Sequence, residues 1–112
     1  MQHRTIIITA RNWRGRDATL AWLDHADLLD RVDEVICNDT DLPPPQFKAW
    51  AVIAHGGSRH VEDDPATAAL EARLDISVDL IDWHWNREFN YPSAVTRHAS
   101  LTALAAELRG VL

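Results

Sequence analysis

The sequence predicts an α/β fold with helices on both faces of a small, mostly parallel sheet. Two observations lead to this prediction. Short apolar segments alternate with longer segments of helical periodicity, and the first strand candidate is apolar on both of its faces. Alternation of strands and helices is typical of parallel sheets. Because the chain has 112 residues, we expect residues 1–112 to form a single domain.

The first half of the chain is expected to contain two strands, each followed by a helix. Residues 4–10 include the β-branched run TIIIT and predict a buried strand, and residues 32–39 predict a second one. Residues 17–30 have helical spacing behind a cap candidate, Asp17. A second helix should begin near Pro45 and end at Gly56-Gly57. The residues expected to face the core are Leu20, Leu23, Ala26 and Leu29 in the first helix and Phe47, Trp50, Ala51 and Ala54 in the second.

The second half continues the alternation. A short strand should end within HVEDDP (residues 60–65), where Asp64 before Pro65 has the position of a helix N-cap. A helix is expected over 65–74, a strand over 76–83 and an aromatic-rich loop over 84–98. Ser100 should cap the last helix, which ends before Gly110. The expected core residues of these helices are Ala69, Leu70, Leu74, Leu101, Leu104, Ala105 and Leu108.

Composition excludes several classes of function. The net charge of −6 argues against general nucleic-acid binding, because phosphate backbones demand clustered Lys and Arg. No apolar run approaches the roughly 18 residues that a membrane span requires, and the N-terminus lacks the features of a secretory signal. We therefore expect a cytoplasmic protein. Cys37 lies in an apolar run and should be a small buried residue.

Polar residues follow three of the predicted strands, after Ile8, Cys37 and Val61. The carboxyl ends of parallel strands meet at one edge of a sheet, and ligands gather there. The last cluster contains three consecutive carboxylates, Glu62, Asp63 and Asp64. Like charges this close repel one another unless a cation lies among them.

Three segments together resemble the motifs of the haloacid dehalogenase superfamily of phosphatases and related hydrolases. The segments IIITAR, QFKAW and HVEDDP match the second, third and fourth motifs of that family in order and with similar spacing. The resemblance covers about residues 4 to 85 and implies a three-layer, Rossmann-like fold of reduced size. It also implies a pocket for a phosphate group and Mg²⁺.

The resemblance implies a role for each matched residue. Thr9 would donate its hydroxyl to a phosphate oxygen, together with the backbone amides of Ala10 and Arg11, and the Arg11 side chain is a further phosphate candidate. Lys48, the only lysine of the chain, would hold the nucleophile and the phosphoryl group. Glu62 and Asp63 would help to hold Mg²⁺, which prefers oxygen ligands.

One departure from the family affects both chemistry and fold. The first family motif, DxDxT, supplies the aspartate nucleophile, and only MQHR precedes the second motif here. Asp39-Thr40-Asp41 is a weak substitute because a proline-rich connector follows it. The missing strand would lie between the strands that end in Thr9 and Glu62. Either those strands pair directly, or a strand comes from a second copy, from a partner chain, or from a rearranged segment such as SAVTR.

Two hypotheses of function follow. The first is a haloacid-dehalogenase-like protein with a phosphate and Mg²⁺ pocket, which hydrolyses phosphomonoesters only when another chain supplies the nucleophile strand. Its partners would be a phosphorylated small molecule or nucleotide and the chain that donates the strand. The second is a catalytically inactive binding or regulatory module, which could form a homodimer along the incomplete sheet.

Two smaller clusters are open to functional interpretation. His55 and His60 with Glu62 could form a transition-metal site, although their spacing matches no established zinc pattern. Four aromatic residues crowd residues 83–91 and would either close the core or form a partner interface. They are Trp83, Trp85, Phe89 and Tyr91.

Overall fold

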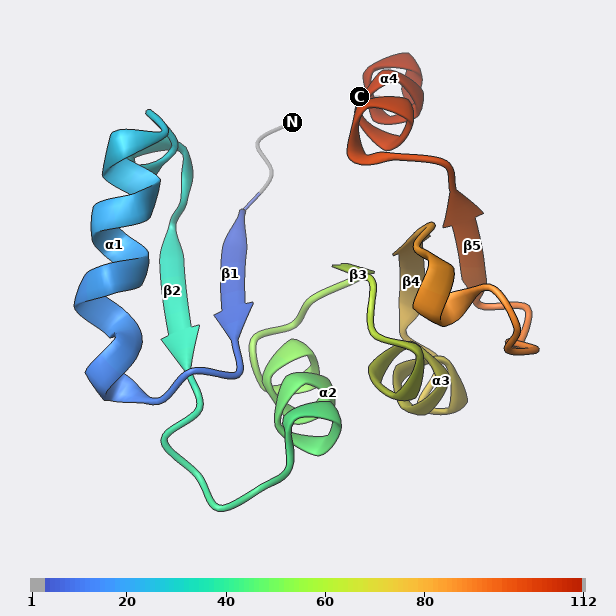
Figure 1. The fold of residues 1–112 in the computed structure, drawn as a ribbon, viewed down its shortest axis with the longest axis horizontal. Helices are drawn as coiled ribbons and strands as arrows, with labels where there is room; N and C mark the ends of the chain where they lie inside the picture. Colours follow the sequence, from blue (N-terminus) through green and yellow to red (C-terminus); the bar gives the residue numbers. More distant parts are fainter. Residues whose placement is uncertain (1–3, 112) are drawn as a thin grey trace. The chain divides into compact units, whose positions relative to one another are not determined.

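The structure is a computed structural model that describes residues 4–111. These residues form two compact units, which divide between Ala51 and Val52. Each unit has its own all-parallel sheet and its own helices, and the two sheets contain two and three strands. The predicted α/β class with parallel strands is confirmed, and the strands are divided between two sheets. Figure 1 shows the elements in chain order.

The first unit contains a two-stranded sheet. Strand β1 pairs in parallel with β2, so that Ile6 lies opposite Glu34 and Thr9 opposite Cys37. The core gathers around Leu23 and includes Cys37, whose predicted burial is confirmed. The elements are β1 (Ile6–Thr9), the 3-10 turn η1 (Trp13–Gly15), α1 (Arg16–His25), the 3-10 turn η2 (Leu29–Arg31), β2 (Glu34–Cys37) and α2 (Pro44–Ala54), and the last of these crosses the boundary between the units.

The second unit contains a three-stranded sheet in the order β3-β4-β5. All neighbours are parallel, and β4 lies in the middle, where Asp79 is opposite Val61 on one side and Thr96 on the other. The elements are β3 (Arg59–Glu62), α3 (Pro65–Arg73), β4 (Ser77–Ile81), the 3-10 turn η3 (His84–Asn86), β5 (Val95–His98) and α4 (Leu101–Val111).

The two faces of the three-stranded sheet carry different side chains, because successive residues of a strand point to opposite faces. Val78 and Leu80 lie on the face that His60 shares, where His60 contacts Glu71 of α3. Asp79 lies on the other face, where His98 contacts Glu107 of α4. Helices therefore meet this sheet from both sides.

The expectation of a loop over residues 84–98 is wrong, since Val95–His98 form β5. The segment VTRH has no alternation of apolar and polar residues, so its strand character depends on pairing with β4. This segment overlaps SAVTR, which was one candidate for the missing strand. It pairs with β4 on the side away from β3. Among residues 4–111, β1 pairs with β2 alone and β3 with β4 alone, so those two strands do not pair directly.

Two ends of the first helix differ from the prediction. Helix α1 begins at Arg16 behind Gly15, so Asp17 lies within the first turn and is not the cap. It ends at His25, five residues before the predicted end. Asp27 has a φ of 57°, a left-handed conformation that stops a helix and that Asp tolerates better than most residues.

The predicted helix faces are partly right. Phe47, Ala51 and Leu104 are buried as expected, whereas Trp50, Ala54 and Leu101 are exposed. In α3 the buried residues are Thr67, Ala68, Glu71 and Ala72, and Leu74 is exposed. Three of these buried residues have small side chains, and the buried carboxylate of Glu71 has a partner on β3. The prediction selected the apolar residues of this helix as its core face, and it is wrong because two of the residues that are buried, Thr67 and Glu71, are polar.

Replacing Asp64 with alanine should lower the free energy of unfolding by about 1–2 kcal/mol. Asp64 caps α3 as predicted, and its Oδ2 accepts from the backbone N and the Oγ1 of Thr67 at 2.9 and 2.8 Å. Asp17→Ala is the control, because Asp17 lies in a first turn without making the cap. Urea unfolding of both variants measures the difference, and equal losses would contradict the role of the cap.

Candidate functional site

The acidic triplet lies at the carboxyl edge of the three-stranded sheet, and its members have different roles. Glu62 is buried, and its Oε1 accepts from the backbone N atoms of Asp63 and Asp64, both at 3.1 Å. The backbone carbonyl of Asp63 accepts from Trp85 Nε1 at 3.1 Å and from Asn86 Nδ2 at 2.8 Å. The loop over residues 62–64 is thus fixed by the Glu62 side chain on its amide groups and by Trp85 and Asn86 on a carbonyl group.

A histidine lies behind this loop between two buried carboxylates. His60 Nδ1 is 2.6 Å from Glu71 Oε1, and its Nε2 is 3.9 Å from Glu62 Oε2. Glu71 is fully buried, so the imidazole satisfies a carboxylate that would otherwise lack a partner. Within residues 4–111, no three His, Cys, Asp or Glu side chains gather in a way that could hold a metal ion. The suggested site of His55, His60 and Glu62 is therefore not assembled by the residues described.

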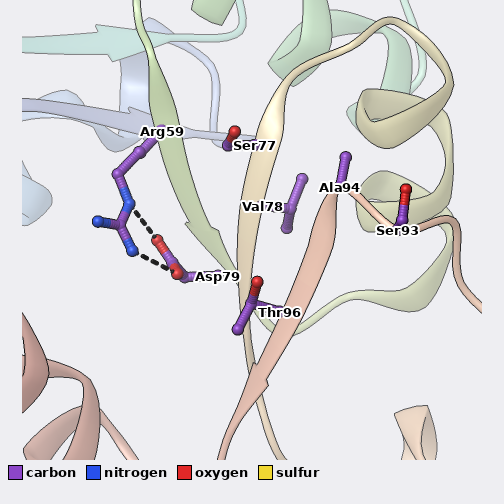
Figure 2. A pocket seen from close by; sticks show the side chains of 7 residues that line it. All are labelled: Arg59, Ser77, Val78, Asp79, Ser93, Ala94 and Thr96. Carbon is purple, nitrogen blue, oxygen red and sulfur yellow. Dashed lines mark hydrogen bonds and ion pairs between the residues drawn. The ribbon is translucent and has the colours of Figure 1, made fainter.

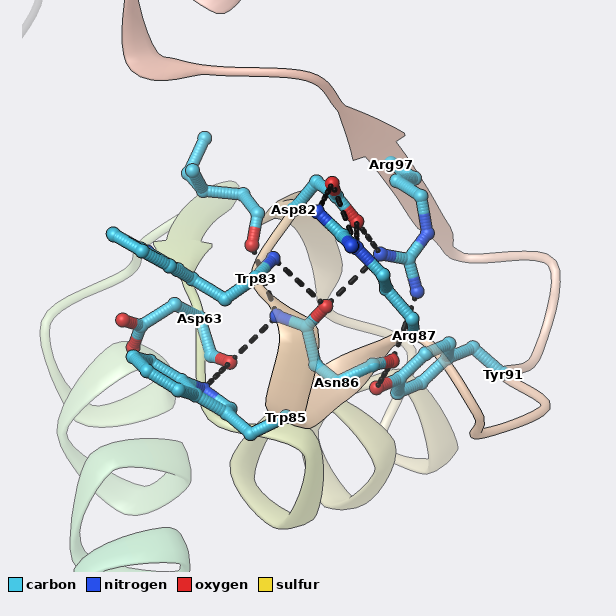
Figure 3. A network of polar contacts seen from close by, with 9 residues as sticks. Asp63, Asp82, Trp83, Trp85, Asn86, Arg87, Tyr91 and Arg97 are labelled. Atoms are coloured by element: carbon cyan, nitrogen blue, oxygen red, sulfur yellow. Dashed lines mark hydrogen bonds and ion pairs between the residues drawn. The ribbon is translucent and has the colours of Figure 1, made fainter.

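Asn86 is the centre of the polar network in Figure 3. Its side chain is fully buried, and its Nδ2 donates to the carbonyls of Asp63 and Ile81 at 2.8 and 2.9 Å. Its Oδ1 accepts from the backbone N of Trp83 at 3.2 Å and from Arg97 Nη1 at 2.9 Å. One side chain therefore ties together the loops that follow β3 and β4.

Asp82, directly after β4, lies between two guanidinium groups. It accepts from Arg87 at 3.0 Å and from Arg97 at 2.7 Å. The hydrogen bond from Arg87, with a smaller contribution from Arg97 and against the effect of burial, holds the pKa of Asp82 below its usual value. The carboxylate is thereby kept ionised and fixed in position.

The aromatic residues of this edge are mostly exposed. The indole rings of Trp83 and Trp85 stack with centroids 5.0 Å apart and planes 8° from parallel. Tyr91 is half-buried, and its hydroxyl donates to the backbone carbonyl of Asn86 at 2.8 Å. Burial raises the pKa of the Tyr91 hydroxyl. Of these three rings, Tyr91 is the most buried, and the two tryptophans are about half exposed.

The opposite face of the sheet carries a second charged group around Asp79. Asp79 is buried and accepts from Arg59 Nε and Nη2 at 2.9 and 2.7 Å. It also contacts His98 Nε2 at 2.8 Å, and His98 Nδ1 is 3.1 Å from Glu107. Figure 2 shows the open pocket of about 320 Å³ beside this group, which is lined by Arg59, Ser77, Val78, Asp79, Ser93, Ala94 and Thr96.

Three of the four predicted phosphate residues, Thr9, Ala10 and Arg11, lie at the carboxyl end of β1, whereas Lys48 lies on α2. Thr9 Oγ1 accepts from the backbone N of Arg11 at 3.2 Å, and the Arg11 carbonyl accepts from Asn38 at 2.8 Å. The loops after β1 and β2 are therefore joined. Asp39 takes part, because its Oδ1 accepts from the backbone N of Trp13 at 2.8 Å. This contact gives Asp39 a structural role in the turn.

The other predicted residues are divided between the units. Lys48 is half-buried on α2 within the first unit, as are Thr9, Ala10 and Arg11. Glu62 and Asp63 are adjacent in the second unit. The phosphate candidates thus belong to one unit and the magnesium candidates to the other.

The sequence interpretation missed the groups around Asn86 and Asp79. The sequence does contain an indication of the group around Asp79. This residue lies in the middle of the apolar strand ISVDLI, where a charged side chain is costly unless it is paired. Asn86 had no such signal. Its partners at Asp63, Ile81 and Arg97 are brought to it only by the fold.

Comparison with protein-family models, curated proteins and solved structures finds no match to this chain. No helix among residues 4–111 is both long enough and apolar enough to cross a membrane.

Proposed function

We propose that this chain is a haloacid-dehalogenase-like protein whose phosphate and Mg²⁺ pocket is completed by a strand from another chain. One observation carries the proposal. The resemblance places the missing strand between the strands that end in Thr9 and Glu62, and the described strands are divided into two sheets at that place. A division at this point is what loss of the family's central strand would produce.

The edge of β1 favours an added strand. Within residues 4–111, β1 has one neighbour, so on its other side the backbone N–H and C=O groups have no strand partner. Natural edge strands are usually protected by charges, prolines or bulges. Strand β1 has no charge, proline or bulge in its apolar run Ile6-Ile7-Ile8, and these side chains are only partly buried.

The described residues suit the parts of phosphoryl transfer that depend on positioning and charge. The Thr9 hydroxyl and the amides of the following turn would bind phosphate oxygens, and Lys48 would neutralise charge. Asp63 offers a carboxylate to Mg²⁺, which would supply further charge neutralisation, while Glu62 orients the loop through two backbone amides. A hard cation needs more oxygen ligands than these, and the carboxylates of the incoming strand would provide them.

Strand addition can be tested with a synthetic peptide that has an apolar strand followed by Asp-x-Asp-x-Thr. We expect it to bind the purified protein and to produce Mg²⁺-dependent hydrolysis of a phosphomonoester. The matched control has the same sequence with N-methyl groups on alternate residues, which blocks strand pairing without changing the side chains. Equal binding of both peptides, or of neither, would overturn the proposal and favour an inactive binding module.

Replacing Asp63 with asparagine should abolish Mg²⁺ binding to the protein with its strand peptide and a phosphate mimic. Asparagine keeps the backbone carbonyl that Trp85 and Asn86 contact but removes the charge that attracts the cation. Asp75→Asn is the control, since Asp75 is exposed beyond the other end of β4 and asparagine accepts its φ of 62°. Calorimetry measures binding, and unchanged binding in Asp63→Asn would exclude Asp63 as a ligand.

A further inference from the structure

Two exposed tryptophans form a flat aromatic surface beside the acidic loop. Trp83 and Trp85 are 47% and 46% exposed, although a large aromatic side chain normally contributes most when it is buried. Their planes differ by 8°, and their centroids are 5.0 Å apart. Figure 3 shows both indoles beside Asp63. We call this surface the tryptophan pair.

The tryptophan pair is held by polar contacts to Asp63 and Asn86. The indole Nε1 of Trp85 donates to the carbonyl of Asp63 at 3.1 Å, and the backbone N of Trp83 donates to Asn86 at 3.2 Å. His84 lies between them in sequence and meets the Trp85 ring edge-on at 5.0 Å. Because the Trp85 indole is hydrogen-bonded and the two rings stack on each other, a ligand that stacks on the pair needs to fix little additional freedom on binding.

The position of the pair indicates what it would bind. Trp85 contacts the backbone carbonyl of Asp63, the residue that we propose as a Mg²⁺ ligand. The phosphate of a bound phosphomonoester would therefore lie close to the pair, and this step rests on the proposed function. The organic part of the ester would then reach a flat aromatic face. Stacking on indole rings favours a planar aromatic group and tolerates any of the bases.

We propose that the tryptophan pair binds the base of a nucleoside monophosphate, which makes nucleotides the substrate class of this site. A base differs from an aliphatic or sugar group because its whole face can lie parallel to an indole ring. The acidic loop beside the pair would hold the phosphate through Mg²⁺ once the incoming strand completes the metal site, so base and phosphate would be recognised by neighbouring parts of one edge of the sheet.

The test is a calorimetric titration of the full chain, with and without the strand peptide, using three probes: adenosine monophosphate, adenosine, and ribose 5-phosphate, each with and without Mg²⁺. We expect both adenine compounds to bind and ribose 5-phosphate to bind much more weakly. Trp83→Leu should weaken both adenine compounds by roughly 5- to 150-fold, the range expected for the loss of one stacked base. Trp22→Leu, which changes an exposed tryptophan of the first unit, should have no effect.

Different outcomes separate this inference from the proposed function. Adenosine binding does not depend on Mg²⁺, so it should persist in Asp63→Asn even if the metal site does not exist. Ribose 5-phosphate binding as tightly as adenosine monophosphate, no binding of either adenine compound, or unchanged binding in Trp83→Leu would each overturn the inference. Circular dichroism verifies that Trp83→Leu is folded, and Trp83→Phe, which retains an aromatic face, should restore part of the affinity.

Discussion

Replacing Asn86 with alanine is expected to lower the free energy of unfolding by roughly 2–4 kcal/mol. The fully buried amide donates to the carbonyls of Asp63 and Ile81 and accepts from the backbone N of Trp83. Alanine leaves the Ile81 carbonyl and the Trp83 N–H without this partner, and each unsatisfied buried group costs about 1–3 kcal/mol. The Asp63 carbonyl keeps its hydrogen bond from Trp85. Solvent reaching the loop would recover part of this loss, which is why the expected total is below the simple sum.

Two further variants isolate the cause. Asn90→Ala removes the same side chain from an exposed position of the same loop and should change the free energy of unfolding by less than about 0.5 kcal/mol. Asn86→Asp keeps the shape but cannot donate to two carbonyls when ionised, so it should also be destabilising. Urea unfolding followed by near-ultraviolet circular dichroism measures all three. Similar values for Asn86→Ala and Asn90→Ala would show that the network contributes little.

Local signals in the sequence predicted much of the fold. The run IIIT is a strand, and Asp64 before Pro65 caps a helix through a contact three residues away. Ser100 does the same for α4, where its Oγ accepts from the backbone N of Ala103. Such features depend on residues within one helical turn or one strand, and the sequence displays those residues together.

Features that depend on distant residues were not predictable in the same way. Val95–His98 form β5 because they pair with β4. The buried face of α3 depends on the contact between the Glu71 carboxylate and His60. The turn after β1 was predicted as a phosphate site from the resemblance of IIITAR to a family motif, and that role stays a prediction. The network around Asn86 was missed because its partners are up to 23 residues away in the chain.

The second large effect is expected at Asp79, the buried carboxylate at the centre of the three-stranded sheet. Replacing it with asparagine at neutral pH should lower the free energy of unfolding by about 3 kcal/mol. The buried imidazole of His98 and the guanidinium of Arg59 both lose their charged acceptor. Arg59 is half exposed and water can solvate it, so most of the loss arises at His98.

The pH dependence of stability should identify the ionised carboxylate as the cause. Burial raises the pKa of Asp79, but hydrogen bonds from Arg59 and His98 outweigh this effect and hold the pKa below its ordinary value of 3.8. A lowered pKa contributes stability that is present above the unfolded value and is lost as the pH falls through the folded value.

The difference in free energy of unfolding between wild type and Asp79→Asn should therefore shrink below about pH 4. Urea unfolding of both proteins from pH 7 to pH 3 measures this difference. Asp75→Asn makes the same change of charge at an exposed position and should show no comparable difference at any pH. A difference for Asp79→Asn that stays constant to pH 3 would mean that the shape of the side chain, and not its ionised carboxylate, stabilises the sheet.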